Sequence, residues 1–381
     1  MVLTAGAIPA GAAAQICPAP AAVTDAQCTV APATIINVTT VNGLGLGDTG
    51  TAARITADGV TVNLNNSGTT GALAQQGATI LFSGSVLNAT VGTLGSAAGR
   101  TGLRATGSGS SITATDTTIS MGLSSTTGTN LVGALADAGG IVRLSGSVTM
   151  NSGANGTGVV GIRAVGAGSL VTMSSGSITA TSRGALGAFA DVGGTVELGN
   201  GVTVTTSGAQ TSGTDPRGSH ALLAAGAGAL LTGTGVNAST SGTLASAARA
   251  ELGGVMRLTN STLSATGAGS AAVFAAGASA VSGGQLTLEG SSVSANQQFG
   301  YGLNVQGAGS SASVTDTRVE ATGNRSIGLN VTGGGSATLA RSSVTSASTG
   351  VTGESAEVDG VQTDVTGMNA GSFGGRPAAL P

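Results

Sequence analysis

The phrase GLNV occurs twice in this chain, at 302–305 and again at 328–331, so that equivalent residues lie 26 positions apart. The two copies belong to a series in which a small residue is followed by an apolar residue, a variable residue, and then Ala or Val. Ten copies recur with steps of 25 to 34 residues, and they end at Ala74, Ala105, Ala136, Ala164, Ala190, Ala224, Ala250, Ala275, Val305 and Val331. Self-similarity at such a period is the signature of a repeat architecture.

Two more short apolar segments follow each copy. The first is an alternating run such as IVRL at 141–144, and the second surrounds one apolar residue with Ser and Thr. That apolar residue is, in chain order, Val86, Ile119, Val148, Ile178, Val202, Val236, Leu263, Val293, Val319 and Val344. Alternation with a period of two predicts β-strands, and strands this short need a neighbour on both sides. The repeat therefore predicts an all-β, three-sided parallel solenoid of about 10–12 coils, each stacked about 4.8 Å from the next.

The order of residues within each phrase predicts which side chains face outward. The second and fourth positions are apolar in every copy and are expected to face the interior. The third position varies and is expected to face outward. It holds Leu135, Phe189, Leu223 and Phe274, which would form an outward contact stripe, although scattered surface apolar residues are also normal. It also holds Asn304 and Asn330, which are expected to stack outside the coil on adjacent rungs.

The composition agrees with an ordered repeat and excludes some partners. Charged residues make up 8% of the chain, aromatic residues 2%, and 68 residues are Gly, while 40% are hydrophobic. Low charge with abundant Gly is also typical of disorder, but the regular apolar positions argue against it. All 13 basic residues are scattered Arg, and the net charge is −3, so nucleic acid is not expected as a partner.

Few residues could carry chemistry. The only histidine, His220, is predicted to be a loop residue beside a strand rather than a catalytic base. The acids Glu197, Glu251 and Glu289 share no motif, and Asp137 and Asp191 are interpreted as turn residues. We therefore predict no catalytic, cofactor-binding or metal-binding residue and no cofactor.

The N-terminal region carries signs of export. The apolar start ends in Ala12-Ala13-Ala14, which fits the end of a secretory signal, with an Ala-rich tail as the alternative. Ten residues separate the only two cysteines, Cys17 and Cys28. In an exported protein such a pair is expected to form a structural disulfide.

The phrases GAGSSASVTDTRVEATG, GGGSATLARSSVTSAS and GGQLTLEGSSVSA resemble those of pertactin-like autotransporter passenger domains. The resemblance covers about residues 35–365. It implies a right-handed parallel β-helix on the surface of a Gram-negative bacterium. It also implies export by a signal peptide and by a C-terminal translocator barrel, and many members of the family act in adhesion or virulence.

These inferences divide the chain into four parts: a signal-peptide remnant (1–14), a cap segment with the cysteine pair (15–34), the β-helix passenger (35–365) and a flexible tail (366–381). The translocator barrel is expected but absent from this chain, because a barrel needs at least eight strands of about ten residues. We expect a monomeric, non-catalytic passenger that is exported to the cell surface or secreted and binds a host cell-surface or matrix component. The alternatives are a β-helical polysaccharide lyase or hydrolase and a truncated passenger with no activity of its own.

Overall fold

The computed structural model shows a parallel β-solenoid of about ten turns with no helix among the residues that it describes. These are residues 15–17, 21–89, 99–122, 130–151, 158–208, 218–267, 275–323, 326–346, 349–353, 356–359 and 365–366. The chain divides into two compact units. Unit 1 is Met1–Ser182 with Gly193–Glu197, and unit 2 is Arg183–Val192 with Leu198–Pro381. The predicted fold class is thus confirmed.

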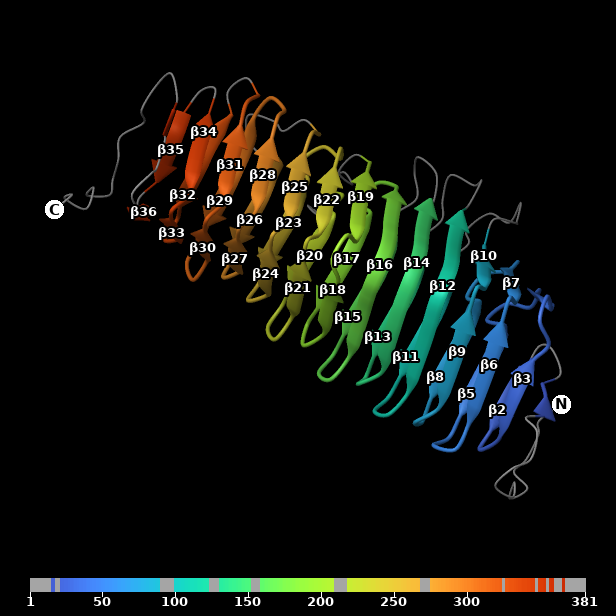
Figure 1. The fold of residues 1–381 in the computed structure, drawn as a ribbon. Coiled ribbons are helices and arrows are strands. Elements are labelled where there is room, and N and C mark those ends of the chain that lie inside the picture. The colour runs from blue at the N-terminus through green and yellow to red at the C-terminus, as the bar shows by residue number, and fades with distance from the viewer. Residues whose placement is uncertain are drawn as a thin grey trace. The chain divides into compact units, whose positions relative to one another are not determined.

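Each turn of unit 1 contributes strand segments to three sides (Figure 1). The first side holds β2 (Ala21–Thr24), β5 (Leu44–Thr49), β8 (Thr70–Gln75), β11 (Thr101–Thr106), β13 (Val132–Asp137) and β15 (Val160–Val165). The second holds β3 (Gln27–Val30), β6 (Arg54–Asp58) and β9 (Thr79–Ser83), and the third holds β4 (Ile35–Val38), β7 (Thr61–Leu64) and β10 (Val86–Asn88). In β12 (Ser111–Gly122), β14 (Ile141–Asn151) and β16 (Leu170–Thr181) the second and third sides form one continuous strand. The short strand β1 (Gln15–Ile16) pairs with β3.

Unit 2 repeats this plan. Its first side holds β17 (Leu186–Asp191), β20 (Leu222–Ala225), β23 (Ser246–Glu251), β26 (Ala275–Val281), β29 (Gly300–Gln306), β32 (Ile327–Thr332) and β35 (Thr349–Gly353). Its second side holds β21 (Leu230–Thr234), β24 (Val255–Thr259), β27 (Gln285–Glu289), β30 (Ser311–Thr315), β33 (Ser336–Ala340) and β36 (Ala356–Asp359). Its third side holds β19 (Thr203–Ser207), β22 (Asn237–Thr240), β25 (Thr262–Ala265), β28 (Ser292–Ala295), β31 (Arg318–Ala321), β34 (Ser343–Ser346) and β37 (Val365–Thr366). The strand β18 (Thr195–Leu198) crosses the division between the units.

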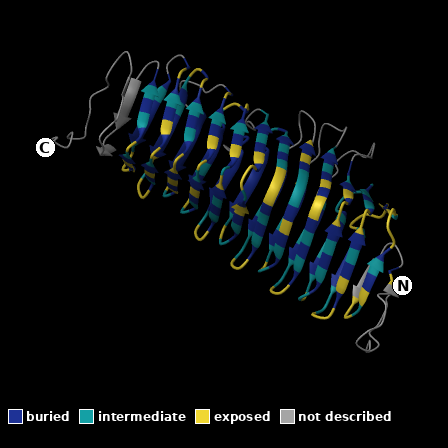
Figure 2. Ribbon diagram, viewed as in Figure 1, coloured by how far each residue is buried: buried dark blue, intermediate teal, exposed yellow. Residues whose placement is uncertain are grey.

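The register confirms that one GLNV phrase stacks on the next. Strands β29 and β32 pair in parallel with Leu303 opposite Leu329 and Val305 opposite Val331. All four of these side chains are fully buried. Buried residues alternate with more exposed ones along many strands, as Figure 2 shows by colour. The alternation has the expected cause, since successive side chains of a strand point to opposite faces.

The interior adjusts residue size along each stack. Phe82 of β9 is 2% exposed, and its register partners in the turns before and after are Ala57 and Ala114. A large ring is therefore placed between two methyl groups, which keeps the core close-packed. The narrow interior does not exclude aromatic residues when the neighbouring turns provide space.

Two details of the predicted repeat were wrong. The copy that ends at Ala275 is not the one that pairs with the neighbouring turns. The third-position residues of those turns, Arg249 and Asn304, both lie opposite Ser279, so the phrase in this turn ends at Ala280. On the third side the inward column contains Leu87, Val204 and Ala238 instead of Val86, Val202 and Val236. Val86 is 37% exposed, whereas Val202 and Val236 are buried just before their strands begin.

Candidate functional site

The predicted asparagine pair is stacked in register on β29 and β32. The amide Nδ2 of Asn330 donates a hydrogen bond to Oδ1 of Asn304 at 2.7 Å. Asn304 and Asn330 are only 8% and 6% exposed, so the prediction that they lie on the outside, in contact with solvent, was wrong. A buried amide must be hydrogen-bonded to avoid a desolvation cost, and the stacked partner meets that need. We therefore assign the pair to the scaffold.

The predicted contact stripe is not an exposed surface. Phe189 of β17 and Leu223 of β20 are register partners on the first side, but they are 3% and 0% exposed. Leu135 of β13 is half-buried. Phe274 lies outside the described residues, and Ser279 occupies the ladder position that was expected for it. The structure therefore overturns an exposed stripe at Phe189 and Leu223.

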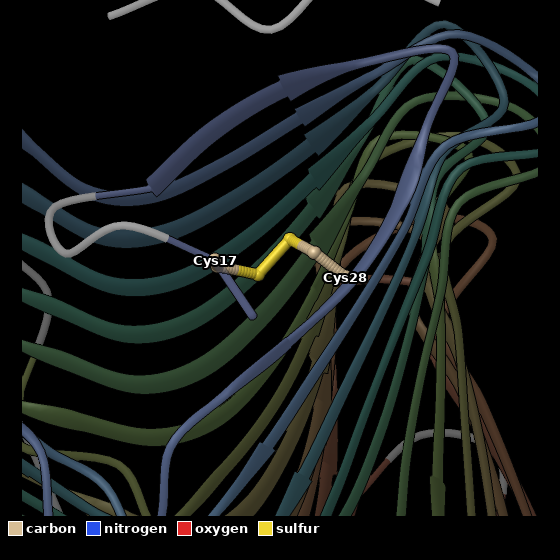
Figure 3. Close-up of a disulfide and its surroundings, with 2 residues drawn as sticks. All are labelled: Cys17 and Cys28. Carbon is tan, nitrogen blue, oxygen red and sulfur yellow. A yellow bond between two sulfur atoms is a disulfide. The ribbon is translucent and has the colours of Figure 1, made fainter. Parts of the chain in front are cut away.

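The cysteine pair lies at the start of unit 1. Cys17 and Cys28 form a disulfide with their Cα atoms 5.2 Å apart (Figure 3). Cys28 belongs to β3 and is opposite Ile55 of the next turn, so the bridge sits at the beginning of an apolar column. Both residues are almost fully buried. The expected cap segment is thus built of strands that pair with the turn that follows.

His220 is part of a buried polar group in unit 2. It is 1% exposed, and its Nδ1 accepts a hydrogen bond from the backbone N–H of Ser246 at 2.8 Å. The neighbouring carbonyl of Ser219 accepts hydrogen bonds from the hydroxyls of Thr206 and Thr240. The prediction of a loop residue beside a strand was correct, since β20 begins two residues later. The buried His220 side chain therefore joins its own turn to the next one through its hydrogen bond with Ser246.

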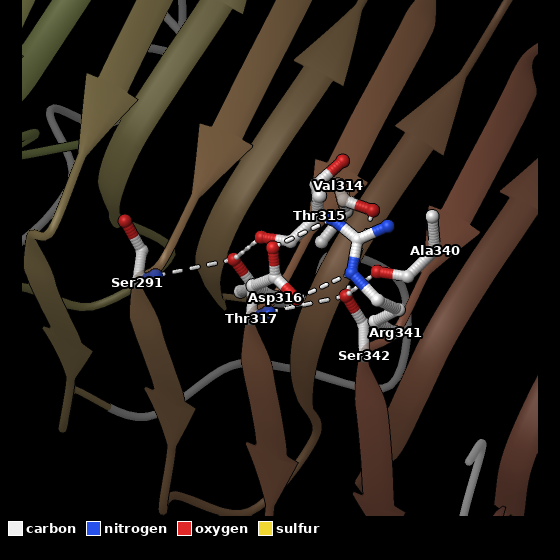
Figure 4. Close-up of polar contacts among 8 residues, drawn as sticks. All are labelled: Ser291, Val314, Thr315, Asp316, Thr317, Ala340, Arg341 and Ser342. Carbon is white, nitrogen blue, oxygen red and sulfur yellow. Dashed lines mark hydrogen bonds and ion pairs between the residues drawn. The ribbon is translucent and has the colours of Figure 1, made fainter. Parts of the chain in front are cut away.

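Several carboxylates of the described chain pair with arginines. Asp316 and Arg341, at equivalent corners of adjacent turns, form a two-point ion pair with contacts of 2.8 and 2.7 Å (Figure 4). The hydrogen bonds from Arg341 lower the pKa of Asp316. Asp137, interpreted as a turn residue, accepts a contact from Arg104 at 2.7 Å.

The three acids that share no motif in the sequence lie on separate strands. Glu197 is on β18, Glu251 on β23 and Glu289 on β27. Glu251 is 7% exposed and binds Arg249 at 2.7 Å. Across the described residues, no three or more His, Cys, Asp or Glu side chains are grouped so that they could hold a metal ion.

Sequence analysis missed a column of buried hydroxyls at the corner between the second and third sides. In unit 2 it contains Ser261, Ser291, Thr317 and Ser342, each no more than 5% exposed. The hydroxyl of Thr317 accepts from the backbone N–H of Ser291 at 3.2 Å and donates to the carbonyl of Thr315 at 2.8 Å (Figure 4). Ser342 in turn accepts from the N–H of Thr317 at 3.1 Å. Each hydroxyl therefore joins two turns.

A sequence signal for this column exists. Each hydroxyl residue follows a residue with positive φ, namely Asn260, Gly290, Asp316 or Arg341, and precedes the third-side strand by one position. A residue in the left-handed backbone conformation forms a turn, and a Ser or Thr that follows it can hydrogen-bond to the local backbone through its hydroxyl.

Two buried ionisable side chains have incomplete hydrogen bonding. The guanidinium of Arg100 donates from Nε to the carbonyl of Asn66 at 2.8 Å, while its two terminal nitrogens have no partner. Burial lowers the pKa of Arg100. The carboxyl of Asp48 has no hydrogen-bond partner on either oxygen and is 1% exposed.

Comparison with known proteins returned no match, whether to protein-family models, to curated proteins or to solved structures. A search of the described residues for a helix of sufficient length and apolarity to cross a membrane also found none. The architecture and the positions of individual side chains are therefore the basis for any statement on function.

Proposed function

We propose that this chain is a non-catalytic passenger, exported to the surface of a Gram-negative bacterium or secreted from it, that presents its outer faces to a host cell-surface or matrix component. The support is the alignment of outward side chains from turn to turn. On the third side of unit 2, Thr203, Asn237, Thr262 and Ser292 are register partners in successive turns. This arrangement repeats short, uncharged side chains over four turns, and Arg318 follows as the register partner of Ser292 in the next turn. Such a regular face suits contact with an extended partner through many weak interactions.

The placement of the polar residues adds to this proposal. His220, Asn304 and Asn330 are buried and hydrogen-bonded within the scaffold. Their role in holding turns together accounts for them without a reaction. The resemblance to pertactin-like passengers supplies the expected compartment and the class of partner. The whole chain is proposed to act as a monomer.

The test is a binding assay with the full chain on host epithelial cells and on immobilised matrix proteins. We expect saturable binding. A third-side double variant, Thr262→Glu with Ser292→Glu, should weaken it because each change places a charge on the proposed contact face. The matched control, Thr287→Glu with Ser313→Glu, makes the same change at exposed register partners on the second side.

Two results would contradict the proposal. The first is that the wild-type chain, shown by circular dichroism to be folded, binds none of the cells or matrix proteins. The second is release of new reducing ends from polysaccharides, which would identify a polysaccharide-active enzyme. Equal loss of binding in both double variants would show that the third side is not the contact face.

A further inference from the structure

One acid lies inside the solenoid, in the part of unit 1 that follows the disulfide. Asp48 is on β5, and its neighbours in register are Val23 of β2 and Ala74 of β8. Its position corresponds to the inward fourth residue of the repeat, which holds buried Ala at 74, 105 and 136. An ionisable group thus replaces a methyl group in an apolar column.

Among the described residues of the strands around β5, no positively charged side chain faces Asp48 from the interior. Strands β2, β4, β6, β7 and β8 pack against or beside β5. Of these, β4, β7 and β8 contain no titratable residue, and β6 carries Arg54 and Asp58, which are both exposed. Asp25, in the turn after β2, is also exposed, and its carboxyl lies against Gly50. In the described part of these elements, Asp48 is the one titratable side chain that faces the interior.

An isolated carboxyl in this position favours its neutral form. Burial raises the pKa of Asp48 to about 7, and the nearby backbone N–H groups of Ile55 and Thr49 offset only part of that rise. Neither oxygen has a donor in good hydrogen-bond geometry, so these N–H groups stabilise the charged form only weakly. Ionisation therefore requires water to reach a site that is closed to it.

The neighbouring strand β2 is the element that can open. It pairs with β5 and lies at the end of the first-side ladder of unit 1. In the chain, β2 lies between Cys17 and Cys28, which the disulfide joins. Edge segments with few partners open at lower free energy than the rest of a fold.

We propose that Asp48 is a pH-sensitive latch: the strand β2 (Ala21–Thr24) stays docked on β5 while Asp48 is protonated, and undocks when Asp48 ionises. The sign follows from proton linkage. The docked state holds the proton more tightly, so docking is strongest at acidic pH and weakens as the pH rises towards the docked-state pKa. Above that pKa both states are ionised and the dependence levels off. This latch does not depend on the proposed binding function.

The test is hydrogen–deuterium exchange of the full chain, followed by mass spectrometry of peptides covering residues 15–58 and corrected for the intrinsic rate at each pH. In the wild type, the opening equilibrium of this segment should rise roughly 50-fold between pH 5 and pH 7 and change little above pH 8. Asp48→Asn should remove this dependence. Asp58→Asn, at the exposed end of β6, is the matched control and should retain it.

A titration that needs no variant complements this test. With ¹³C-labelled aspartate, one carboxyl of the wild type should titrate near neutral pH in the nuclear magnetic resonance spectrum. The latch is overturned if the exchange of residues 15–58 in the wild type does not depend on pH. It is equally overturned if Asp48→Asn keeps the full dependence, or if every aspartate titrates below pH 5.

Discussion

Individual hydroxyls hold this scaffold together at its corners. In unit 2 the side chain of Thr317 satisfies the N–H of Ser291, which is buried, and the carbonyl of Thr315, which is partly buried. Buried backbone groups without partners are costly, so a threonine that appears to be a surface polar residue in the sequence is a structural requirement.

Thr317→Val should destabilise unit 2, because the methyl group fills the space of the hydroxyl but bonds to neither backbone group. We expect a loss of about 1–3 kcal/mol in the free energy of unfolding, the cost of leaving buried polar groups unpaired. Urea unfolding followed by circular dichroism measures it. Thr317→Ser keeps the hydroxyl and should cost much less. Equal losses for Val and Ser would show that packing of the methyl group, and not the hydrogen bonds, is what matters.

At the scale of the strand, the GLNV phrase begins with Gly because the first and third sides of the solenoid approach each other closely at that position. A Cβ on Gly302 of β29 would lie 2.6 Å from Cγ1 of Val319 on β31 and 2.5 Å from the carbonyl oxygen of Gly328. Two successive turns of unit 2 carry Ala at the equivalent position. Ala221 has Ala238 as its third-side residue, and Ala247 has Leu263, whereas the facing residue of Gly302 is Val. Unit 2 thus has a methyl group on the first side in two turns whose facing third-side residue is not the β-branched Val.

Gly302→Ala should therefore destabilise the chain by about 1–3 kcal/mol, the usual cost of overpacking a well-packed core. The double variant Gly302→Ala with Val319→Ala should recover part of that loss, because the second change reproduces the Ala221–Ala238 combination. Thermal unfolding of both single variants and the double variant completes a double-mutant cycle. Additive losses would contradict a direct conflict between the two side chains.

At the scale of the whole molecule, the sequence was sufficient for the fold and for little of the candidate site. The interval between GLNV copies predicted the turn, and the pairing of Leu303 with Leu329 confirms it. The copy ending at Ala275 was assigned wrongly, because an Ala-rich stretch matches the four-residue repeat pattern at several different starting positions. Only the ladder shows that Ser279 is the residue opposite Arg249.

Exposure could not be predicted in the same way. Alternation tells which face of a strand a residue occupies, but it does not tell whether that face is open to solvent. Phe189, Leu223 and Asn304 were all predicted to face out, and all three are buried. The raised pKa of Asp48 was equally hidden, because it is caused by burial of the carboxyl group in the folded chain and not by a motif.

The most direct test of this account is cross-linking between turns, since stacking one repeat on the next is its central claim. In a Cys17→Ser, Cys28→Ser background, Gln306→Cys with Thr332→Cys places two cysteines at register partners on β29 and β32. The spacing of paired strands, about 4.8 Å, falls within the range that a disulfide spans. We predict rapid disulfide formation on mild oxidation, measured by mass spectrometry. The out-of-register pair Gln306→Cys with Asn330→Cys should oxidise far more slowly, and equal oxidation of both pairs, or of neither, would contradict the predicted stacking.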